Sequence, residues 1–582
     1  MYNCNKYFKS VLVFILMILS LNSVSAQNLE GVSAESLKKK ANDKIKDALK
    51  DPFKVSGGIN ASMTTYNAYG MEGNRDPLLW QIGMNVNFKI LGKINVPFSA
   101  NISSQQFALS LPNVPDLPQP FNTFGMSPKY KAFTVHVGYR SINLSELTLN
   151  GSQFLGGGVE IAPKGSFIKG KAIYGRFAKP ILFNLDGSIA VVPTYARFGW
   201  GGGVTLGRQI DNQVTFNIFK ARDDINSLNT NIDELIVRPA DNLVFGTVIK
   251  QKITKKISID GELDFSLYTS DIGIDEEVLA GTSYINNILI FKNNTSTSIK
   301  KAMIFNADYK PNFAKFKLKY RRIDADYKTL GTSYINDDYE DLSLKTSFAL
   351  LKKKMMFSVQ GGVRRDNLEE DKVSKQLRLI SGVDVTYNVN EKWTIASNYS
   401  NFNSKTRQVI VLTIDSLYFS QTTQAFGLNV TRTNKGEKMT QTLNMAFNFQ
   451  DAIVNETSVS SFYNANISWM GQLLKSKTTI TTSLVAFHNI SETNEITNIG
   501  PTVSLASGFF KKKMTLNLSV AYLPTFVDLV SAGSIINISA GGVFKINEKH
   551  KFNYNVSNIV RKIPSTPQST ELTATIAYQF TF

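Results

Sequence analysis

Apolar and polar residues alternate along many long segments of this chain. In segment 80–90, WQIGMNVNFKI, every second residue from Trp80 to Ile90 is apolar, and the residues between are mostly polar. Segments 133–140, 314–321 and 442–449 repeat the pattern. Successive side chains of a strand point to opposite faces, so each segment is predicted to be a strand with one apolar and one polar face. These strands run to about ten to fourteen residues, which is longer than most soluble strands and long enough to cross a bilayer when tilted.

Short polar turns separate these strands at regular intervals. Each interval holds two strands and one longer loop, such as 364–375 or 403–419. Alternating tight turns and long loops are typical of a membrane-spanning β-barrel. Twelve turns and two chain ends give thirteen hairpins or 26 strands, and the proline-rich segment 111–120 leaves a range of 24 to 26. The predicted fold class is therefore all-β, a single large antiparallel transmembrane β-barrel. The predicted turns lie near Lys93, Pro128, Lys164, Asp211, Lys255, Asn312, Lys353, Asn390, Gly436, Ser476, Lys512 and Glu548.

The N-terminal segment has the pattern of a secretory signal peptide. Two lysines precede the apolar run VLVFILMILSL, and small residues follow it at Val24 and Ala26. This pattern predicts export and cleavage near Ala26-Gln27. The single cysteine, Cys4, lies before the cleavage site. The mature chain is then expected to lack disulfides, thiol catalysis and cysteine-bound metals.

Composition excludes two other classes of protein. No second apolar stretch approaches the roughly 20 residues that a membrane-spanning helix needs. The net charge is +18, but nucleic acid is not an expected partner of an exported chain. The 38 Phe and 22 Tyr residues suit strands and the aromatic belts at membrane interfaces.

The C-terminal segment is predicted to be the strand that closes the barrel. Alternate residues there are apolar or aromatic up to the last residue of the chain: Leu572, Ala574, Ile576, Tyr578, Phe580 and Phe582. With the signal peptide and the long alternating strands, this ending resembles the Gram-negative outer-membrane β-barrel proteins, over roughly residues 54 to 582. The resemblance implies that the barrel-assembly machinery reads the terminal strand, and that this strand pairs with the first one. Outer-membrane lipid and that machinery are the expected partners, and Ile576, Tyr578, Phe580 and Phe582 the closing residues.

Three parts of the chain are expected. Residues 1–26 form the signal peptide and 53–582 the outer-membrane barrel. Between them, residues 27–52 have helical character, with Ser33 as N-cap, Pro52 as a stop and an apolar face. This segment is either a helix that docks in the periplasm or enters the lumen, or a weakly ordered lead-in. The apolar face comprises Leu37, Ala41, Ile45, Ala48 and Leu49.

The size of the barrel raises the question of what fills it. A cylinder of 26 strands would be roughly 50 Å across, and only about 26 residues precede the first strand of the mature chain. No plug domain fits into so short a segment. Infolded loops, a collapsed cross-section or a partner protein must therefore fill the lumen. The candidate loops are 109–124, 221–239 and 271–298.

One predicted strand carries a basic stripe: Lys315, Lys317, Lys319 and Arg321. Each charge would cost about 2–4 kcal/mol near the bilayer midplane on the lipid face. The stripe must therefore face the lumen or lie at a wet strand end. It either favours anions in the lumen or pairs with acids on neighbouring strands and loops.

Two functions fit this sequence. One is a channel or transport barrel with a partly basic lumen filled by infolded loops. The other is a non-enzymatic scaffold or translocon component whose partner occupies the lumen or docks on the N-terminal helix. No catalytic, cofactor or metal site is expected, because His136, His488 and His550 are scattered and the glycine runs at 156–158 and 201–203 lack the Lys-Ser/Thr of a phosphate loop. Strand glycines are the better interpretation of those runs.

Overall fold

The computed structural model describes residues 52–104, 122–182, 192–228, 237–274, 291, 293–332, 334–408, 419–564 and 566–582. Contacts divide the chain into a large unit, 55–88 with 94–582, and a small one, 1–54 with 89–93. In the described part of the small unit, the Leu91 N–H donates to the Pro52 carbonyl at 2.8 Å. The signal peptide and all of the predicted helix except Pro52 lie outside the described residues.

The described residues form strands connected by turns and loops, with two single-turn 3-10 helices, η1 (Ile225–Ser227) and η3 (Phe510–Lys512). The strands are β1 (Phe53–Tyr69), β2 (Leu78–Ile90), β3 (Ile94–Ser103), β4 (Thr123–Met126), β5 (Lys129–Tyr130), β6 (Phe133–Arg140), β7 (Phe154–Ile161), β8 (Ile168–Ala178), β9 (Arg197–Gln209), β10 (Asn212–Asp223), β11 (Asp241–Lys252), β12 (Ile257–Thr269), β13 (Thr297–Tyr309), β14 (Ala314–Ile323), β15 (Tyr339–Leu350), β16 (Met355–Asp366), β17 (Ser374–Asn388), β18 (Trp393–Gln408), β19 (Phe419–Lys435), β20 (Met439–Val454), β21 (Thr457–Leu473), β22 (Thr479–Ser491), β23 (Glu495–Phe509), β24 (Met514–Val527), β25 (Val530–Lys545), β26 (His550–Lys562) and β27 (Ser569–Thr581).

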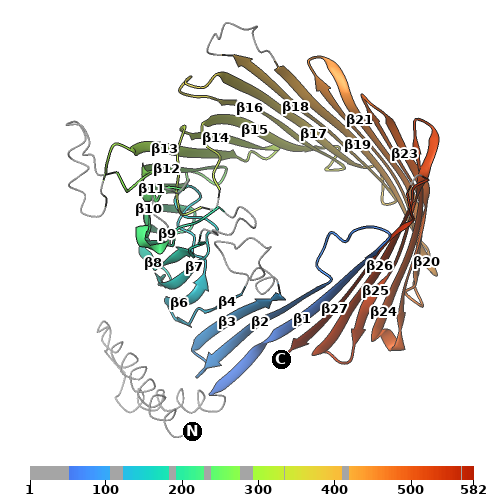
Figure 1. Cartoon of the computed structure of the whole chain (residues 1–582), viewed down its shortest axis with the longest axis horizontal. Coiled ribbons are helices and arrows are strands. Elements are labelled where there is room, and N and C mark those ends of the chain that lie inside the picture. The colour runs from blue at the N-terminus through green and yellow to red at the C-terminus, as the bar shows by residue number, and fades with distance from the viewer. Residues whose placement is uncertain are drawn as a thin grey trace. The chain divides into compact units, whose positions relative to one another are not determined.

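The strands of the large unit form one closed sheet. Each strand pairs with its neighbours in the sequence, and β27 pairs antiparallel with both β26 and β1. The short strands β4 and β5 both pair with β3 and with β6, so they share one position in the sheet. The barrel therefore has 26 strand positions, as the turn spacing predicts. Figure 1 shows β9 to β12 on the left and β24 to β26 across from them on the right.

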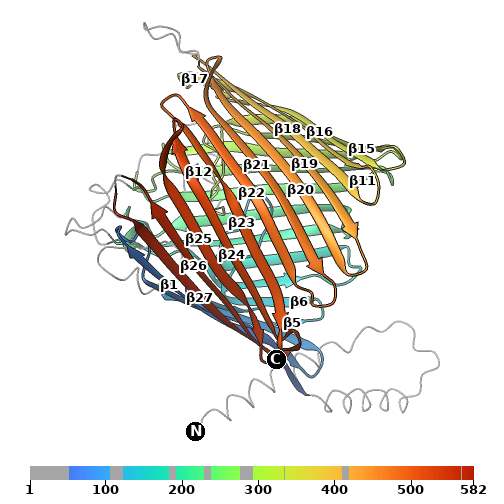
Figure 2. The ribbon, with the colours of Figure 1, turned by 90° about the vertical axis from the view of Figure 1, so that its right-hand side faces the viewer.

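The closing strand lies where the sequence predicts it. Its register on β1 runs from Thr581 opposite Gly58 to Thr570 opposite Tyr69. Beyond that ladder, Phe582 and Gly57 exchange two backbone hydrogen bonds of 2.9 and 3.0 Å. Figure 2 shows β27 alongside β1 and β26, with the C-terminus at the strand ends.

The closing residues also form aromatic contacts at this seam. The Phe580 ring lies 5.2 Å from Phe582 and 4.6 Å from His550, measured between ring centroids. His550 Nδ1 and the Tyr578 hydroxyl are 2.6 Å apart. Ile576 lies on the same strand face and is half exposed, as a lipid-facing side chain would be. The terminal phenylalanine is thus held by backbone and ring contacts together.

Tight turns occur at all twelve predicted places, and the turn predicted near Pro128 falls at 131–132. The loops at the other strand ends differ from the prediction. The loop within segment 364–375 is shorter than expected, because 364–366 belong to β16 and 374–375 to β17, which leaves 367–373 as the connection. The β24–β25 connection is just Asp528 and Leu529. The sequence pattern overestimates the length of these loops, because polar residues continue along the strands themselves. The strands reach 17 residues in β19 and β21.

Candidate functional site

The two faces of the sheet are distinguished by what covers them. On β13 to β15, one face presents exposed apolar side chains, including Phe305, Leu318 and Leu344. On the opposite face, Ile304 and Ile323 are buried beneath loop residues. Exposed apolar side chains suit the lipid-facing surface, and loops can cover a sheet from within only by folding into the barrel. The loop-covered face is therefore the inner one.

Two loops fold against this inner wall. The first infolded loop, 141–153, connects β6 to β7, and the second infolded loop, 324–338, connects β14 to β15. In Figure 1 the yellow-green trace of the second loop lies on the inner side of β10 to β12. Neither loop is among the three fillers expected from the sequence, and more than half of the residues in those three segments lie outside the described residues. A signal for the first loop was present, since INLSELTL at 142–149 is apolar but follows no strand period.

Apolar side chains of both loops form what we term the loop core. Leu147, Leu149 and Tyr327 are fully buried, and they pack on wall residues such as Phe219 and Ile304. Fully burying one such side chain stabilises the packed state by about 1.5–3 kcal/mol. Burial also raises the pKa of the Tyr327 hydroxyl well above its ordinary value. The two loops are therefore held in place by a packed apolar core, and their central side chains are not exposed to solvent.

Carboxylates of β12 anchor the first infolded loop. Glu262 accepts hydrogen bonds from the backbone N–H groups of Leu147, at 2.7 Å, and Glu146, at 3.3 Å. The Thr148 hydroxyl donates to Asp264. Each of these hydrogen bonds contributes on the order of 1 kcal/mol. These contacts fix the middle of the loop on the wall.

Hydrogen bonds also join the two loops to each other. The Thr329 hydroxyl donates to the Thr148 carbonyl at 2.7 Å, and the Tyr327 hydroxyl donates to the Leu147 carbonyl at 3.1 Å. The Leu330 N–H donates to the buried side chain of Asn242 on β11 at 3.0 Å. The loops and the wall therefore form one connected structure.

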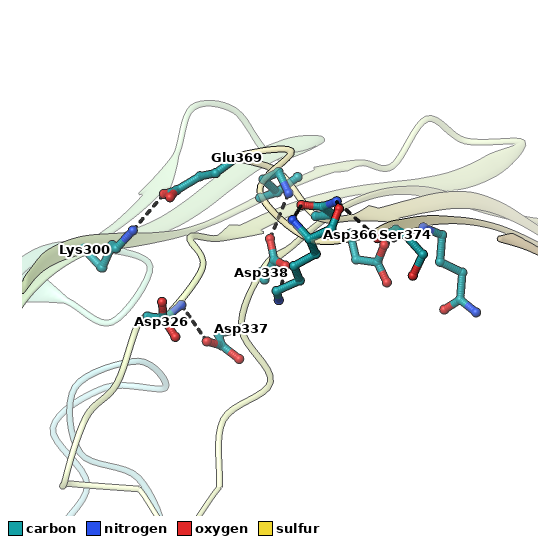
Figure 3. Close-up of polar contacts among 11 residues, drawn as sticks. Lys300, Asp326, Asp337, Asp338, Asp366, Glu369 and Ser374 are labelled. Atoms are coloured by element: carbon teal, nitrogen blue, oxygen red, sulfur yellow. Dashed lines mark hydrogen bonds and ion pairs between the residues drawn. The ribbon is translucent and has the colours of Figure 1, made fainter. Parts of the chain in front are cut away.

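Charged and polar residues tie the second infolded loop to the strand ends, as Figure 3 shows. Beside the loop, Lys300 of β13 contacts Glu369 of the β16–β17 loop at 2.8 Å, and within the loop Asp337 accepts a hydrogen bond from the Asp326 N–H at 2.7 Å. Asp338 pairs with Lys372 in the β16–β17 loop, and this hydrogen bond raises the pKa of the lysine. At the other end of the loop, the Asp324 N–H donates to the Lys301 carbonyl of β13 at 3.1 Å, so both ends of the second loop are restrained.

The basic stripe lies on the inner wall beside the first infolded loop. Arg321 is paired with Glu146 of that loop. Lys317 lies opposite Asp308 on β13 and Lys345 on β15, and Lys315 lies opposite Ser347. Within the described residues, Lys315, Lys317 and Lys319 have no ion-pair partner. Pairing with an acid of a loop, one of the two roles expected for the stripe, therefore applies to Arg321. The three lysines of the stripe have no such partner in the described residues.

A hollow of about 650 Å³ lies along this part of the wall, and we term it the charged hollow. Its lining includes five cationic and three acidic residues. Asp341 is paired with Arg364 at 2.7 Å, and Asp308 with Lys310 at 3.2 Å, while the third acid accepts a hydrogen bond from Asn306. The cations without a partner in the described residues are three lysines. The charged lining residues are Asp260, Asp308, Asp341, Lys317, Lys319, Arg321, Lys345 and Arg364.

The inner wall at β20 to β24 has a different character, and we term it the amide wall. The lipid-facing positions there carry exposed apolar residues such as Phe447, Ile467 and Val503. The inward positions of these five fully described strands hold no charged residue. Asn444 donates to Asn429 at 3.3 Å, linking side chains across neighbouring strands. The asparagines of the amide wall are Asn444, Asn448, Asn464, Asn466, Asn489, Asn498 and Asn517.

The histidines lie apart from one another in the described residues. His136 contacts Ser127 at 2.9 Å, and His488 contacts Thr497 at 2.8 Å, on separate parts of the barrel. The glycine runs lie within β7 and β9, and a Cβ on Gly156 would come within 2.1 Å of the Tyr174 carbonyl on the next strand. Close approach of two strands explains that glycine. No group of three His, Cys, Asp or Glu residues in the described ranges has metal-site geometry.

No described helix is both long enough and apolar enough to cross a membrane.

Solved structures similar to this chain are outer-membrane proteins. The P pilus usher PapC translocation pore has 9% identity and a TM-score of 0.35, with 91% of this chain and 99% of that chain covered. The copper transporter OprC has 7% identity and a TM-score of 0.40, with 91% and 80% covered. The alcaligin receptor FauA from Bordetella pertussis has 10% identity and a TM-score of 0.34, with 90% and 76% covered. No family model matches the chain, and no curated protein matches its sequence.

The class of protein follows from the strands themselves. A closed antiparallel sheet with an apolar outer face and a polar inner face is the architecture of an outer-membrane β-barrel. The chain resembles the proteins of that class, as its sequence indicates.

Proposed function

We propose that this protein is a channel through which small hydrophilic solutes cross the outer membrane, and that its charged hollow favours anions. The export signal and its cleavage near Ala26-Gln27 are part of this proposal. The observation that carries it is the charge balance of the hollow. Its acids are each paired or hydrogen-bonded, whereas Lys317, Lys319 and Lys345 have no partner in the described residues.

The location of the three lysines inside the barrel explains how they can affect ion selectivity. Charges inside a narrow, low-dielectric surround interact more strongly with a passing ion than charges on an open surface. The first infolded loop neutralises Arg321 through Glu146 but leaves the lysines of β14 and β15 facing the lumen. An anion in the hollow is thus attracted by three unpaired lysines, which outnumber the one acid without an ion-pair partner, Asp260.

Ion selectivity in planar bilayers tests this proposal. The purified protein should conduct, and its reversal potential in a salt gradient should show a preference for anions. K317E/K319E should shift that potential toward cations. The matched control K438E/K475E places the same charge changes in two tight turns, and its shift should be smaller.

Three outcomes would count against the proposal. If the protein does not conduct, the channel function is wrong. If K317E/K319E conducts with unchanged selectivity, the charged hollow does not set the preference. If the protein is isolated from native membranes with a stoichiometric partner and conducts only after that partner is removed, a scaffold or translocon component becomes the better assignment.

A further inference from the structure

A second hollow, of about 390 Å³, lies on the inner face of β22 to β26, and we term it the neutral hollow. Its lining includes no charged residue. Consecutive strands contribute these residues at neighbouring positions, since Ser504 lies opposite Ser519 and Ser519 lies opposite Ser539. The inward lining residues that carry hydroxyl or amide groups include Thr481, Ser504, Asn517, Ser519, Ser539 and Asn555.

A glycine opens the neutral hollow between two amides. Gly541 lies directly opposite Asn517 on one neighbouring strand and Asn555 on the other. A Cβ at Gly541 would come within 2.9 Å of the Asn555 side-chain oxygen. The two asparagines therefore flank a position without a side chain, about 10 Å apart across two strand spacings.

Both amides are available to a ligand. Asn517 and Asn555 are exposed, and neither side chain makes a hydrogen bond within the described residues. Each amide offers two donors and an acceptor, and each nearby hydroxyl offers a donor and two acceptors. The Ser504 hydroxyl donates to Ser519 at 3.3 Å, which leaves the other capacity of both groups free.

This set of groups selects for one class of ligand. A charged solute would lose hydration there without gaining an opposite charge, because the adjoining amide wall is also uncharged. An apolar solute would leave the amides and hydroxyls unpaired. A solute that carries many hydroxyl groups and no charge can pair with both kinds of group.

We infer that the neutral hollow is a binding subsite for uncharged polyhydroxylated solutes of the saccharide class. The inference extends the proposed function by naming a solute class, and it rests on that function only for the route by which the solute arrives. Binding itself can be measured whether or not the barrel conducts. The neutral hollow and the charged hollow then serve different solutes on different parts of the wall.

Isothermal titration calorimetry on the full-length protein in detergent tests the inference. Sucrose is the probe, and glucuronate is its charged comparator. Sucrose should bind, and glucuronate should bind at least several-fold more weakly at this site. The N517L/N555L variant keeps side-chain size but removes both amides, and it should weaken sucrose binding about tenfold or more.

Two further variants make the test specific. N448L changes one asparagine of the amide wall outside the neutral hollow and should leave sucrose binding unchanged. If N517L/N555L does not insert, S539A removes a single lining hydroxyl and should weaken binding about twofold to tenfold. Unchanged sucrose affinity in whichever of these two hollow variants folds would overturn the inference, and so would equal binding of glucuronate.

Conductance separates this inference from the proposed function. If sucrose binds in a way that depends on Asn517 and Asn555 but the protein does not conduct, the inferred subsite stands and the channel function is wrong. Anion-selective conductance without sucrose binding would leave the channel in place and remove the subsite.

Discussion

Shortening Leu149 to alanine should release the first infolded loop without unfolding the barrel. Leu149 is fully buried in the loop core against Phe154, Phe177 and Phe219. Truncating a buried leucine costs about 2–5 kcal/mol, because contacts are lost and a cavity remains. The strands keep their own ladders, so the cost falls mainly on the local equilibrium between the packed and open loop. At 1.4 kcal/mol for each tenfold change, opening should become roughly 30-fold to several thousand-fold more frequent.

Thiol labelling can measure that opening. Thr148 is fully buried, so a cysteine placed there should react with a maleimide only when the loop opens. Cys4 is the single native cysteine and lies in the segment expected to be removed, so the mature protein adds no background. We expect T148C/L149A to label at least 30-fold faster than T148C alone.

A matched leucine provides the control. Leu344 on β15 is 46% exposed on the outer face, so L344A creates no cavity in the loop core. T148C/L344A should label at the rate of T148C alone. Equal labelling rates for the L149A and L344A variants, with both proteins folded and inserted, would refute the conclusion that apolar burial holds the loop.

Two further predictions concern the barrel itself. Deleting Tyr578 to Phe582 removes the last four of the twelve residue pairs between β27 and β1, so insertion should fail and the protein should accumulate as a protease substrate. Normal amounts of heat-modifiable protein in the membrane would contradict closure at this seam. A cysteine at Glu370, in the β16–β17 loop, should react with an impermeant maleimide on whole cells, whereas one at Lys353, in a tight turn at the opposite strand ends, should not; the reverse pattern would mean that the barrel is inverted.

Local features of the barrel could be predicted from the sequence because they depend on neighbouring residues. The two-residue period fixes which face is apolar, and turn chemistry fixes where a strand ends. The segment 442–449 shows the period, since its apolar residues lie on the outer face of β20 and its asparagines on the inner face. The strand number then followed from the turns.

Contacts between distant segments could not be predicted in this way. Glu146 and Arg321 are 175 residues apart, and nothing in either neighbourhood indicates that a loop returns to this strand. The same holds for Thr148 and Asp264, 116 residues apart. From the sequence, the basic stripe therefore consists of four equivalent cations. Only the position of the first infolded loop reveals that Arg321 is neutralised.

The seam between the first and last strands has a consequence for how the chain folds. Bringing the ends of a flexible segment of this length together costs about 5–6 kcal/mol of chain entropy, which far exceeds the cost of closing any single hairpin. Such a non-local contact is expected to form late, after the local hairpins.

Until that moment, β1 and β27 are free sheet edges that can pair with another chain. The ladder from Gly58 to Tyr69 thus removes the last two edges in a single event. A chain interrupted before Ser569 would lack β27, so β1 and β26 would stay free edges and that chain would aggregate more readily than one with the closed seam.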